Sequence, residues 1–393
     1  MGSSLNGLLD ARDLDLSPAV RATARSYADQ GGLLGAFVYA LVDLETDDPE
    51  LAAALASIPT DLFAASSLHD DAIDESGTWD ARHRKRRLNE RVTLGDLAFV
   101  DVVETAAALP SDVDLGSALE TVRQIGAGQL REESVDPATA TLEDALGRLE
   151  DRGAVWGDLA TALVDATGGY SSAQLEALHR LASEGMVVLA VLDDVEDLPT
   201  DVDNGVATVP RALYDGDLAA ADSTDDAVEA FLASGAPTRL EALLAERSAA
   251  LEAATLAFSE TLYHSDAALL AAVRRALSWY CGRICSVPVE RTVPENRQRA
   301  LRAQLAGPAE KRRETIASAV AESPIEPSAA SIDLDAAVES VVDLPPESLA
   351  DVLITGTHAA TIFDDAVATS LPDALESLER CVSTDRPGSN VRT

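Results

Sequence analysis

The sequence predicts an all-α protein, and three observations support this fold class. Apolar residues recur at helical spacing along most of the chain, Ala and Leu dominate among them, and no hairpin dipeptide lies between alternating apolar runs. Of the 393 residues, 47% are hydrophobic and 25% are charged, so the chain has enough apolar material for a sizeable core. This length permits one large helical domain with an appendage, or two domains.

Helical periodicity is interrupted at two places. Ser76–Glu90 is a strongly charged stretch between helices, and Pro288–Pro294 closes the main helical run. We therefore predict a helical domain over 15–290, a C-terminal helical extension over 295–382 and a disordered tail over 383–393. Within the first domain, apolar periodicity predicts these helices in order: Ala19–Asp29, Leu33–Leu44, Pro49–Asp74, Val92–Ala108, Leu115–Glu133, Leu142–Thr167, Ser171–Asp197, Thr224–Ala233, Thr238–Tyr263 and Ala267–Cys285.

The charge balance argues against two classes of partner. The chain has 68 acidic and 30 basic residues and a net charge of −38, so a nucleic-acid backbone or an anionic membrane surface would be repelled. Lys85 and Lys311 are the only lysines, and this acidic, arginine-biased composition is typical of halophilic proteins, in which salt screens surface repulsion. We interpret most carboxylates as solvated surface groups.

The sequence shows no sign of export or of a membrane span. Three cysteines, Cys281, Cys285 and Cys381, are too few for a disulfide framework and lack the spacing of zinc ligands. Residues 1–10 lack the basic start of a signal peptide, and the apolar run Leu33–Val42 is far shorter than the ~20 residues of a membrane helix. We expect a soluble, cytoplasmic protein.

Two short acidic motifs stand out against the acidic background. DDAID over 70–74 ends the apolar helix 61–74, and DDVED over 193–197 ends the apolar helix 181–197. In each motif the first and last aspartates are four residues apart, so their carboxylates lie one turn apart on the same helix face. These like charges repel each other, and the C-terminal end of a helix disfavours negative charge.

A divalent cation would offset this repulsion. Mg²⁺ fits, because it takes oxygen ligands from one or two carboxylates and completes its shell with water and phosphate oxygens. Two such faces opposed across a helical bundle would bind metal ions and a diphosphate. The alternative is a pair of acidic helix ends in an acidic protein, but two copies about 120 residues apart, each closing an apolar helix, argue against it.

At these motifs the sequence resembles the trans-prenyl diphosphate synthases, the polyprenyl synthetase family of the class I isoprenoid synthase superfamily. The family's two aspartate-rich motifs are matched by His69–Glu75 and Asp193–Asp197. Between and after them, LGDL over 94–97, GQL over 128–130 and DVDNGVATVP over 201–210 are similar to the family's AGD, EGQ and GKxTLP segments. The match keeps the family's order over Leu33–Cys285.

The resemblance implies a helical bundle around a central cavity and Mg²⁺-dependent ionisation of an allylic prenyl diphosphate. It implies six candidate catalytic and metal-binding residues, of which Asp70, Asp74 and Asp194 are the expected ligands, and the others are ligands or their immediate neighbours: Asp71, Asp193 and Asp197. Basic residues that follow the first motif are candidates for binding the substrate diphosphate: Arg84, Arg86 and Arg87.

The sequence departs from the family at its cationic positions. The GGKRxRP segment that holds isopentenyl diphosphate in the family is replaced by GGLLGAF over 31–37, and two further lysines are replaced by Asp151 and Val206. The arginine pair expected after the first motif is replaced by Trp79-Asp80. These losses predict poor binding of isopentenyl diphosphate.

Three functions follow from this pattern of matches and losses. The first is a chain-elongating prenyltransferase, and the second is a terpene synthase or cyclase that uses no isopentenyl diphosphate. The third is a non-catalytic subunit that regulates an active prenyl diphosphate synthase. The expected partners are an allylic prenyl diphosphate and either a second copy of the chain or another prenyl synthase.

Overall fold

Helices and turns, without a strand, form the described part of the chain, which in this computed structural model comprises residues 17–74, 79–132, 135–264, scattered positions between 268 and 315, and 371–384. The predicted all-α fold class is confirmed. The chain divides into two compact units. Unit 1 comprises Met1–Leu115, Leu163–Tyr170 and Tyr263–Ala366, and unit 2 comprises Gly116–Ala162, Ser171–Leu262 and Val367–Thr393.

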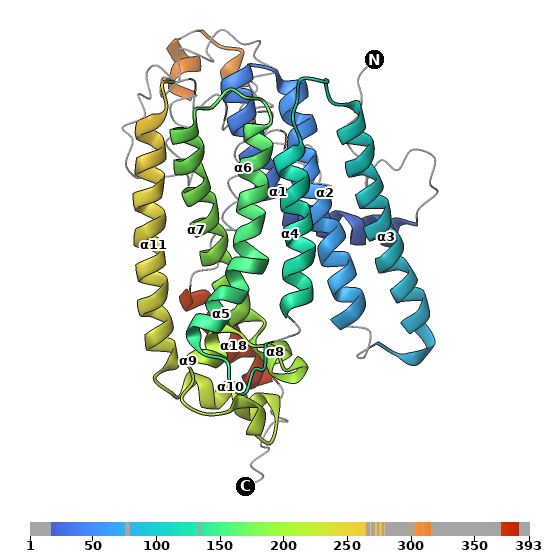
Figure 1. The fold of residues 1–393 in the computed structure, drawn as a ribbon, viewed down its shortest axis with the longest axis vertical. Helices are drawn as coiled ribbons and strands as arrows, with labels where there is room; N and C mark the ends of the chain where they lie inside the picture. The colour runs from blue at the N-terminus through green and yellow to red at the C-terminus, as the bar shows by residue number, and fades with distance from the viewer. Residues whose placement is uncertain are drawn as a thin grey trace. The chain divides into compact units, whose positions relative to one another are not determined.

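Unit 1 contains three long helices, α1 (Pro18–Thr46), α2 (Pro49–Asp74) and α3 (Ala81–Ala108) (Figure 1). The middle helix, α2, packs against both of the others. The buried cluster that joins the three helices is rich in alanine, which lets the helix axes approach closely: Ala24, Tyr27, Ala64, Ala65, Leu68, Leu94 and Ala98.

The helix α2 is the core helix of unit 1. Among the described residues it has the length and composition needed to cross a membrane, but 72% of its most apolar window is buried inside the protein. This burial is the pattern of a helix enclosed by protein rather than by lipid. The predicted cytoplasmic location stays a prediction.

Two predicted boundaries in unit 1 are wrong. The first two predicted helices form one continuous helix, α1, in which Gly31 lies close to the backbone of Thr60 on α2. Packing against α2 thus outweighs the low helix propensity of glycine at this point. The next helix, α3, begins at Ala81 rather than Val92, because the side chain of Asp80 accepts a hydrogen bond from the backbone N–H of Arg82 and caps the helix. Residues 81–90 are therefore helical and not a stretch between helices.

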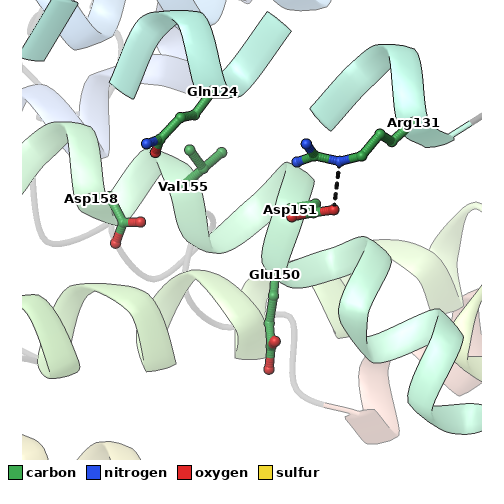
Figure 2. Close-up of a pocket in the computed structure, with 6 residues that line it drawn as sticks. All are labelled: Gln124, Arg131, Glu150, Asp151, Val155 and Asp158. Carbon is green, nitrogen blue, oxygen red and sulfur yellow. Dashed lines mark hydrogen bonds and ion pairs between the residues drawn. The ribbon is translucent and has the colours of Figure 1, made fainter. Parts of the chain in front are cut away.

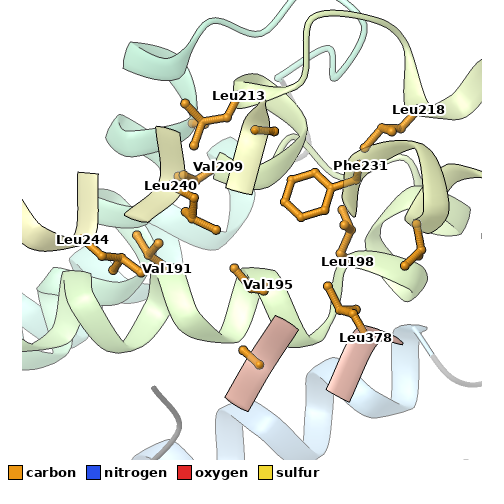
Figure 3. Close-up of a cluster of buried hydrophobic side chains, with 14 of the residues drawn as sticks. Val191, Val195, Leu198, Val209, Leu213, Leu218, Phe231, Leu240, Leu244 and Leu378 are labelled. Carbon is orange, nitrogen blue, oxygen red and sulfur yellow. The ribbon is translucent and has the colours of Figure 1, made fainter. Parts of the chain in front are cut away.

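Unit 2 is built around the long pair α7 (Ser172–Glu196) and α11 (Ala236–Thr261), which pack against each other. Shorter elements gather around the end of α7, where its last turns enter a buried apolar cluster (Figures 1 and 3). The other elements that begin in this unit are α4 (Gly116–Glu132), α5 (Leu142–Leu149), the π-helical turn η2 (Glu150–Ala154), α6 (Val155–Asp165), α8 (Leu198–Asn204), α9 (Val209–Leu213), η3 (Leu218–Ala220), α10 (Thr224–Leu232) and α18 (Leu371–Thr384).

The sequence predicted the long helices of unit 2 and the short helix α10, as Thr224–Ala233, but missed α8 and α9. The predicted helix Leu142–Thr167 is divided into α5, η2 and α6, and 201–210 forms most of α8, a glycine turn and the start of α9. Gly205 ends α8 with a φ of 71°, a conformation that glycine adopts without steric cost. Within the predicted C-terminal extension, α18 is described and belongs to unit 2.

Several predictions fall outside the described residues. These include residues 385–393 of the predicted tail, most of the predicted extension and most of the predicted helix Ala267–Cys285. The domain boundaries at 15–290, 295–382 and 383–393 therefore stay predictions.

Candidate functional site

The second acidic motif lies where α7 passes into α8. Asp193 and Asp194 occupy the last turn of α7, and Asp197 stands between the two helices. The backbone N–H of Asp197 donates to the carbonyl of Asp193, and that of Asp201 donates to the carbonyl of Asp197, both at 2.9 Å. The helical path thus continues across the junction. The carboxylates of Asp193, Asp197 and Asp201 lie along this path at a spacing of four residues.

Both carboxylate oxygens of Asp194 accept hydrogen bonds from other groups of the protein. Its Oδ1 accepts a hydrogen bond from Arg148 Nη2 at 2.7 Å, and its Oδ2 accepts one from the backbone N–H of Val209 at 3.0 Å. The side chains of Arg148 and Asp194 are 5% and 9% exposed, so this ion pair is shielded from water. Asp194 thereby joins α7 to α5 and α9.

The carboxylates around Asp194 are electrostatically crowded. Asp193 and Asp197 keep surface open to solvent, but the surrounding protein excludes much of their water. This partial burial, together with neighbouring carboxylates, raises the pKa of Asp197 to about 6, and burial also raises the pKa of Asp193. Burial, followed by the charges of Asp194 and Asp197, raises the pKa of Asp201 to about 8.

Arg148 and Arg152 offset part of the negative charge of these carboxylates. Burial raises the pKa of Asp194 to about 6, although the charge of Arg148 and the Val209 N–H act in the opposite direction. Arg152 lowers the pKa of Asp193 and Asp197 against the larger effect of burial. The end of α7 therefore retains a strong demand for positive charge.

Sequence reasoning missed three residues of this site: Arg148, Arg152 and Asp201. A signal was present for Asp201, because it follows Asp197 by four residues. The arginines could not be assigned to the motif from sequence, since only the packing of α5 and η2 beside α7 brings them to it.

The first acidic motif ends α2 in unit 1. Asp70 is half-buried there, while the side chain of Asp74 lies outside the described residues. Asp71 accepts a hydrogen bond from the hydroxyl of buried Tyr27, and Arg91 Nε lies 3.9 Å from its Oδ2. The guanidinium of Arg91 also stands 4.9 Å from the centre of the Tyr27 ring. Tyr27 and Arg91, which sequence reasoning also missed, thus hold Asp71 between α1 and α3.

The matched segment on α3 lies against the first motif. A Cβ at Gly95 would collide with the imidazole of His69, so the glycine leaves room for this ring. His69 Nε2 lies 3.4 Å from a carboxylate oxygen of Asp96. Gly95 and Asp96 of the LGDL segment therefore contact the end of α2 at His69.

The candidate diphosphate-binding arginines lie on the first turns of α3. Arg84, Arg86 and Arg87 are all exposed to solvent. Arg84 Nη2 donates a hydrogen bond to the carbonyl of Trp79 at 3.3 Å. The exposed guanidinium groups are accessible to an anion, and their role stays a prediction.

Comparison of the sequence with protein-family models and with curated proteins finds no match. Comparison of the fold with solved structures finds several matches. The structure is similar to heptaprenyl diphosphate synthase from Staphylococcus aureus, with a TM-score of 0.53, 16% identity and coverage of 70% of this chain and 94% of that one. It is also similar to a polyprenyl synthase from Caulobacter crescentus CB15 complexed with calcium and isoprenyl diphosphate, with a TM-score of 0.52, 20% identity and coverage of 72% and 94%.

A third solved structure agrees with these two. It is the geranylgeranyl pyrophosphate synthetase from the archaeon Geoglobus acetivorans, with a TM-score of 0.51, 16% identity and coverage of 72% of this chain and 99% of that one. The chain has the trans-prenyl diphosphate synthase fold. The resemblance indicated by the motifs is thus confirmed for the fold, and the chain carries further sequence beyond the part shared with these synthases.

The structure places the segment that matches the synthases' GGKRxRP inside α1. Gly31, Gly32 and Gly35 are buried, and a Cβ at Gly35 would collide with the side chain of Thr60 and the ring of Trp279. The Trp279 ring also stacks on Tyr39 with 5.6 Å between ring centres. This stretch therefore packs against neighbouring side chains, and GGLLGAF over 31–37 contains no cation.

The other two substituted positions are bound within the protein. Asp151 pairs with Arg131 Nε at 3.0 Å across the hollow shown in Figure 2, and the carbonyl of Val206 accepts a hydrogen bond from Arg211 Nη1 at 2.8 Å. This hollow has a volume of about 320 Å³, and neither acidic motif contributes to its lining: Gln124, Arg131, Glu150, Asp151, Val155 and Asp158. It is therefore separate from the predicted metal site.

The donor atoms of the second motif fit a divalent cation in part. Within the described residues, no three His, Cys, Asp or Glu side chains are placed to share one ion. Mg²⁺ requires fewer protein ligands, because water and phosphate oxygens complete its shell. Asp193 and Asp197 offer crowded carboxylate oxygens, whereas both oxygens of Asp194 already accept hydrogen bonds.

Proposed function

We propose that the chain is a Mg²⁺-dependent enzyme that ionises an allylic prenyl diphosphate. The observation that carries this proposal is the spacing of Asp193, Asp197 and Asp201 by four residues along the helical path from α7 to α8, where burial disfavours the negative charge of all three carboxylates. The fold shared with prenyl diphosphate synthases supports the proposal. The Caulobacter protein, complexed with calcium and isoprenyl diphosphate, supports the pairing of a divalent ion with this class of substrate.

The proposed roles of the two motifs differ from residue to residue. Asp70 and Asp74 of the first motif, and Asp193 and Asp197 of the second, are the proposed metal ligands. Asp194, expected from sequence to be a ligand, is assigned instead to hold α7 in place, because its oxygens bind Arg148 and the Val209 N–H. Asp71 takes the same holding role through Tyr27 and Arg91.

The proposed chemistry needs two things: positive charge that stabilises the leaving diphosphate, and apolar surroundings that exclude water from the allylic cation. Bound Mg²⁺ supplies the positive charge that stabilises the leaving diphosphate as the C–O bond breaks. The exposed arginines on α3, Arg84, Arg86 and Arg87, would bind the outer phosphate oxygens through charge-assisted hydrogen bonds. Apolar helix faces would shelter the allylic cation from water. That both motifs are needed for the same reaction stays a prediction from the sequence.

A terpene-synthase activity is the second candidate, and a specific observation favours it. Chain elongation needs a second diphosphate pocket for isopentenyl diphosphate, and the segment expected to hold it is buried in α1 and contains no cation. Each missing charge-assisted contact is worth about 1.5–3 kcal/mol, so binding of isopentenyl diphosphate would weaken by orders of magnitude. The allylic substrate, held mainly through metal, would be affected much less.

Product analysis distinguishes these functions. The protein is incubated in high salt with Mg²⁺ and allylic diphosphates of several lengths, with and without isopentenyl diphosphate. Longer diphosphates formed only with isopentenyl diphosphate would identify a chain-elongating enzyme, and hydrocarbons or alcohols formed without it would identify a terpene synthase. A parallel reaction with excess EDTA tests the metal requirement. No turnover of any substrate would contradict the proposed activity and favour a regulatory subunit.

A further inference from the structure

The C-terminal helix α18 lies beyond the matched stretch Leu33–Cys285, yet it joins the core of unit 2. It packs against α7 and α10. Ala374, Leu378 and Val382, at 0%, 1% and 9% exposure, belong to the same buried cluster as Val195 and Leu198. Figure 3 shows Leu378 pointing from α18 toward the segment that carries Val195 and Leu198.

The sequence of α18 is suited to this contact. Its apolar residues recur at spacings of three and four, and together they form one face: Leu371, Ala374, Leu375, Leu378 and Val382. Glu376, Glu379 and Arg380 are exposed to solvent. A helix of 14 residues is marginal in isolation, so α18 depends on the cluster for its own stability.

The surface that α18 covers is next to the acidic motif. Val195 separates Asp194 from Glu196, and Leu198 directly follows Asp197. Both apolar residues are fully buried in the cluster. The contact with α18 therefore acts on the same turns of the chain that present the carboxylates.

The last turn of α7 and the start of α8 need stabilising contacts. Asp193, Asp194 and Asp197 repel one another at the negative end of the helix dipole, and the last turn of α7 contains no basic residue. The buried pair with Arg148 fixes Asp194, whereas Asp193 and Asp197 keep exposed surface at the junction of α7 and α8, so their position follows the path of the backbone there. Without an apolar contact on Val195 and Leu198, this end would tend to unwind.

We propose that α18 is a brace that keeps the acidic end of α7 folded, and that Leu378 is a positioning residue for Asp193 and Asp197. The proposal goes beyond the proposed function, because it concerns the shape of the acidic turn whatever ligand the turn binds. The C-terminal segment of the chain thus completes a site whose charged residues lie far from it in sequence.

Hydrogen exchange of the full-length, metal-free protein tests this brace. In Leu378→Ala we expect the amides of 193–201 to exchange about tenfold faster or more, while those in the first half of α7 keep their rates. Leu378→Met should retain slow exchange, because the side chain keeps its volume. Glu376→Asp and Leu378→Asp place the same side chain on the exposed and on the buried face of α18; only the buried one should speed exchange at 193–201.

A rescue variant separates bracing from general stabilisation. Adding Asp193→Asn to Leu378→Ala removes part of the repulsion and should restore slow exchange at 193–201. Circular dichroism establishes whether each variant is folded, and Leu378→Ala remains informative if Leu378→Asp is unfolded. Unchanged exchange at 193–201 in Leu378→Ala would overturn the proposal. So would a uniform rise across unit 2, or a failure of Asp193→Asn to restore protection.

Discussion

The second aspartate of each acidic motif contacts an arginine from a neighbouring element. Asp194 pairs with buried Arg148 at 2.7 Å, and Asp71 lies 3.9 Å from Arg91 and accepts a hydrogen bond from Tyr27. Of the two pairs, Asp194–Arg148 is buried. A buried pair contributes little net stability, but removal of one partner leaves an uncompensated charge in the interior. We infer that these contacts fix the helix ends, and the first and last aspartates of each motif are the proposed metal ligands.

Removal of Arg148 should therefore lower the stability of the protein far more than removal of an arginine from an exposed ion pair. Arg148→Met is expected to lower the free energy of unfolding by about 3–5 kcal/mol, because Asp194 would stay buried without its counter-ion. The double variant with Asp194→Asn should recover much of the loss. Denaturant unfolding measures both changes.

Arg131→Met is the matched control for this prediction. Arg131 pairs with Asp151 at 3.0 Å, but its side chain is 56% exposed. An exposed pair of this kind contributes about 0–1 kcal/mol. Equal losses in Arg148→Met and Arg131→Met would contradict the importance assigned to the buried pair.

The crowded carboxylates also predict how stability depends on pH. The pKa values of Asp194 and Asp197 are raised to about 6 and that of Asp201 to about 8. An acid with a raised pKa in the folded state binds more protons folded than unfolded, so the metal-free protein should lose stability as pH rises from about 4 to about 8. In Asp201→Asn the decrease in melting temperature between pH 6 and 8 should become smaller.

Thermal unfolding at constant ionic strength with EDTA checks this dependence. Asp222→Asn is the control, because this residue is exposed and takes no part in the acidic cluster. It should leave the slope of melting temperature against pH unchanged. A slope in Asp201→Asn equal to that of the unmodified protein would argue against the raised pKa of Asp201.

At the element scale, sequence periodicity predicted the long helices and the two helix ends that carry the motifs. The predicted helix Pro49–Asp74 has the bounds of α2, and Ser171–Asp197 differs from α7 by one residue at each end. These helices are long and strongly apolar, so their pattern is unambiguous. The start of α3 was missed because its first turns are polar and depend on the Asp80 cap.

Sequence reasoning identified the aspartates of the site but not their partners. A D-D-x-x-D pattern is local, and the geometry of one helix places its carboxylates on one face. Tyr27, Arg91 and Arg148 reach the motifs through tertiary packing, which no local pattern encodes. The short helices α8 and α9 were missed for a related reason, since a glycine turn and contacts with Arg211 determine their path.

The close approach of α1 to α2 makes a prediction about glycine. Gly31 lies against the carbonyl of Thr60 and the Cβ of Phe63, so Gly31→Ala should force the two helices apart and cost about 1–3 kcal/mol. Gly126, on α4, has open space where a Cβ would stand, and Gly126→Ala should stabilise the protein by about 0.5–1 kcal/mol. Denaturant unfolding of the two variants measures these opposite effects. A stabilising Gly31→Ala would contradict the described packing.

At the scale of the whole molecule, the chain shares its fold with known prenyl diphosphate synthases. The synthases from Staphylococcus, Caulobacter and Geoglobus share 70–72% of the chain, at 16–20% identity. This chain has a net charge of −38, a segment of α1 without charged residues at 31–37, and a C-terminal helix, α18, that joins the buried cluster of unit 2. Homodimer formation, or pairing with another prenyl synthase, stays a prediction.

The central proposal is that both acidic motifs are needed for Mg²⁺-dependent ionisation of a prenyl diphosphate. The most direct test measures diphosphate release from allylic prenyl diphosphates in high salt, for the unmodified protein and for Asp70→Ala, Asp193→Ala and Asp151→Ala. We expect Mg²⁺-dependent release that falls by about 100-fold or more in Asp70→Ala and in Asp193→Ala, while Asp151→Ala, outside both motifs, retains it. Absence of release from the unmodified protein, or unchanged release in a folded Asp70→Ala or Asp193→Ala variant, would contradict the account.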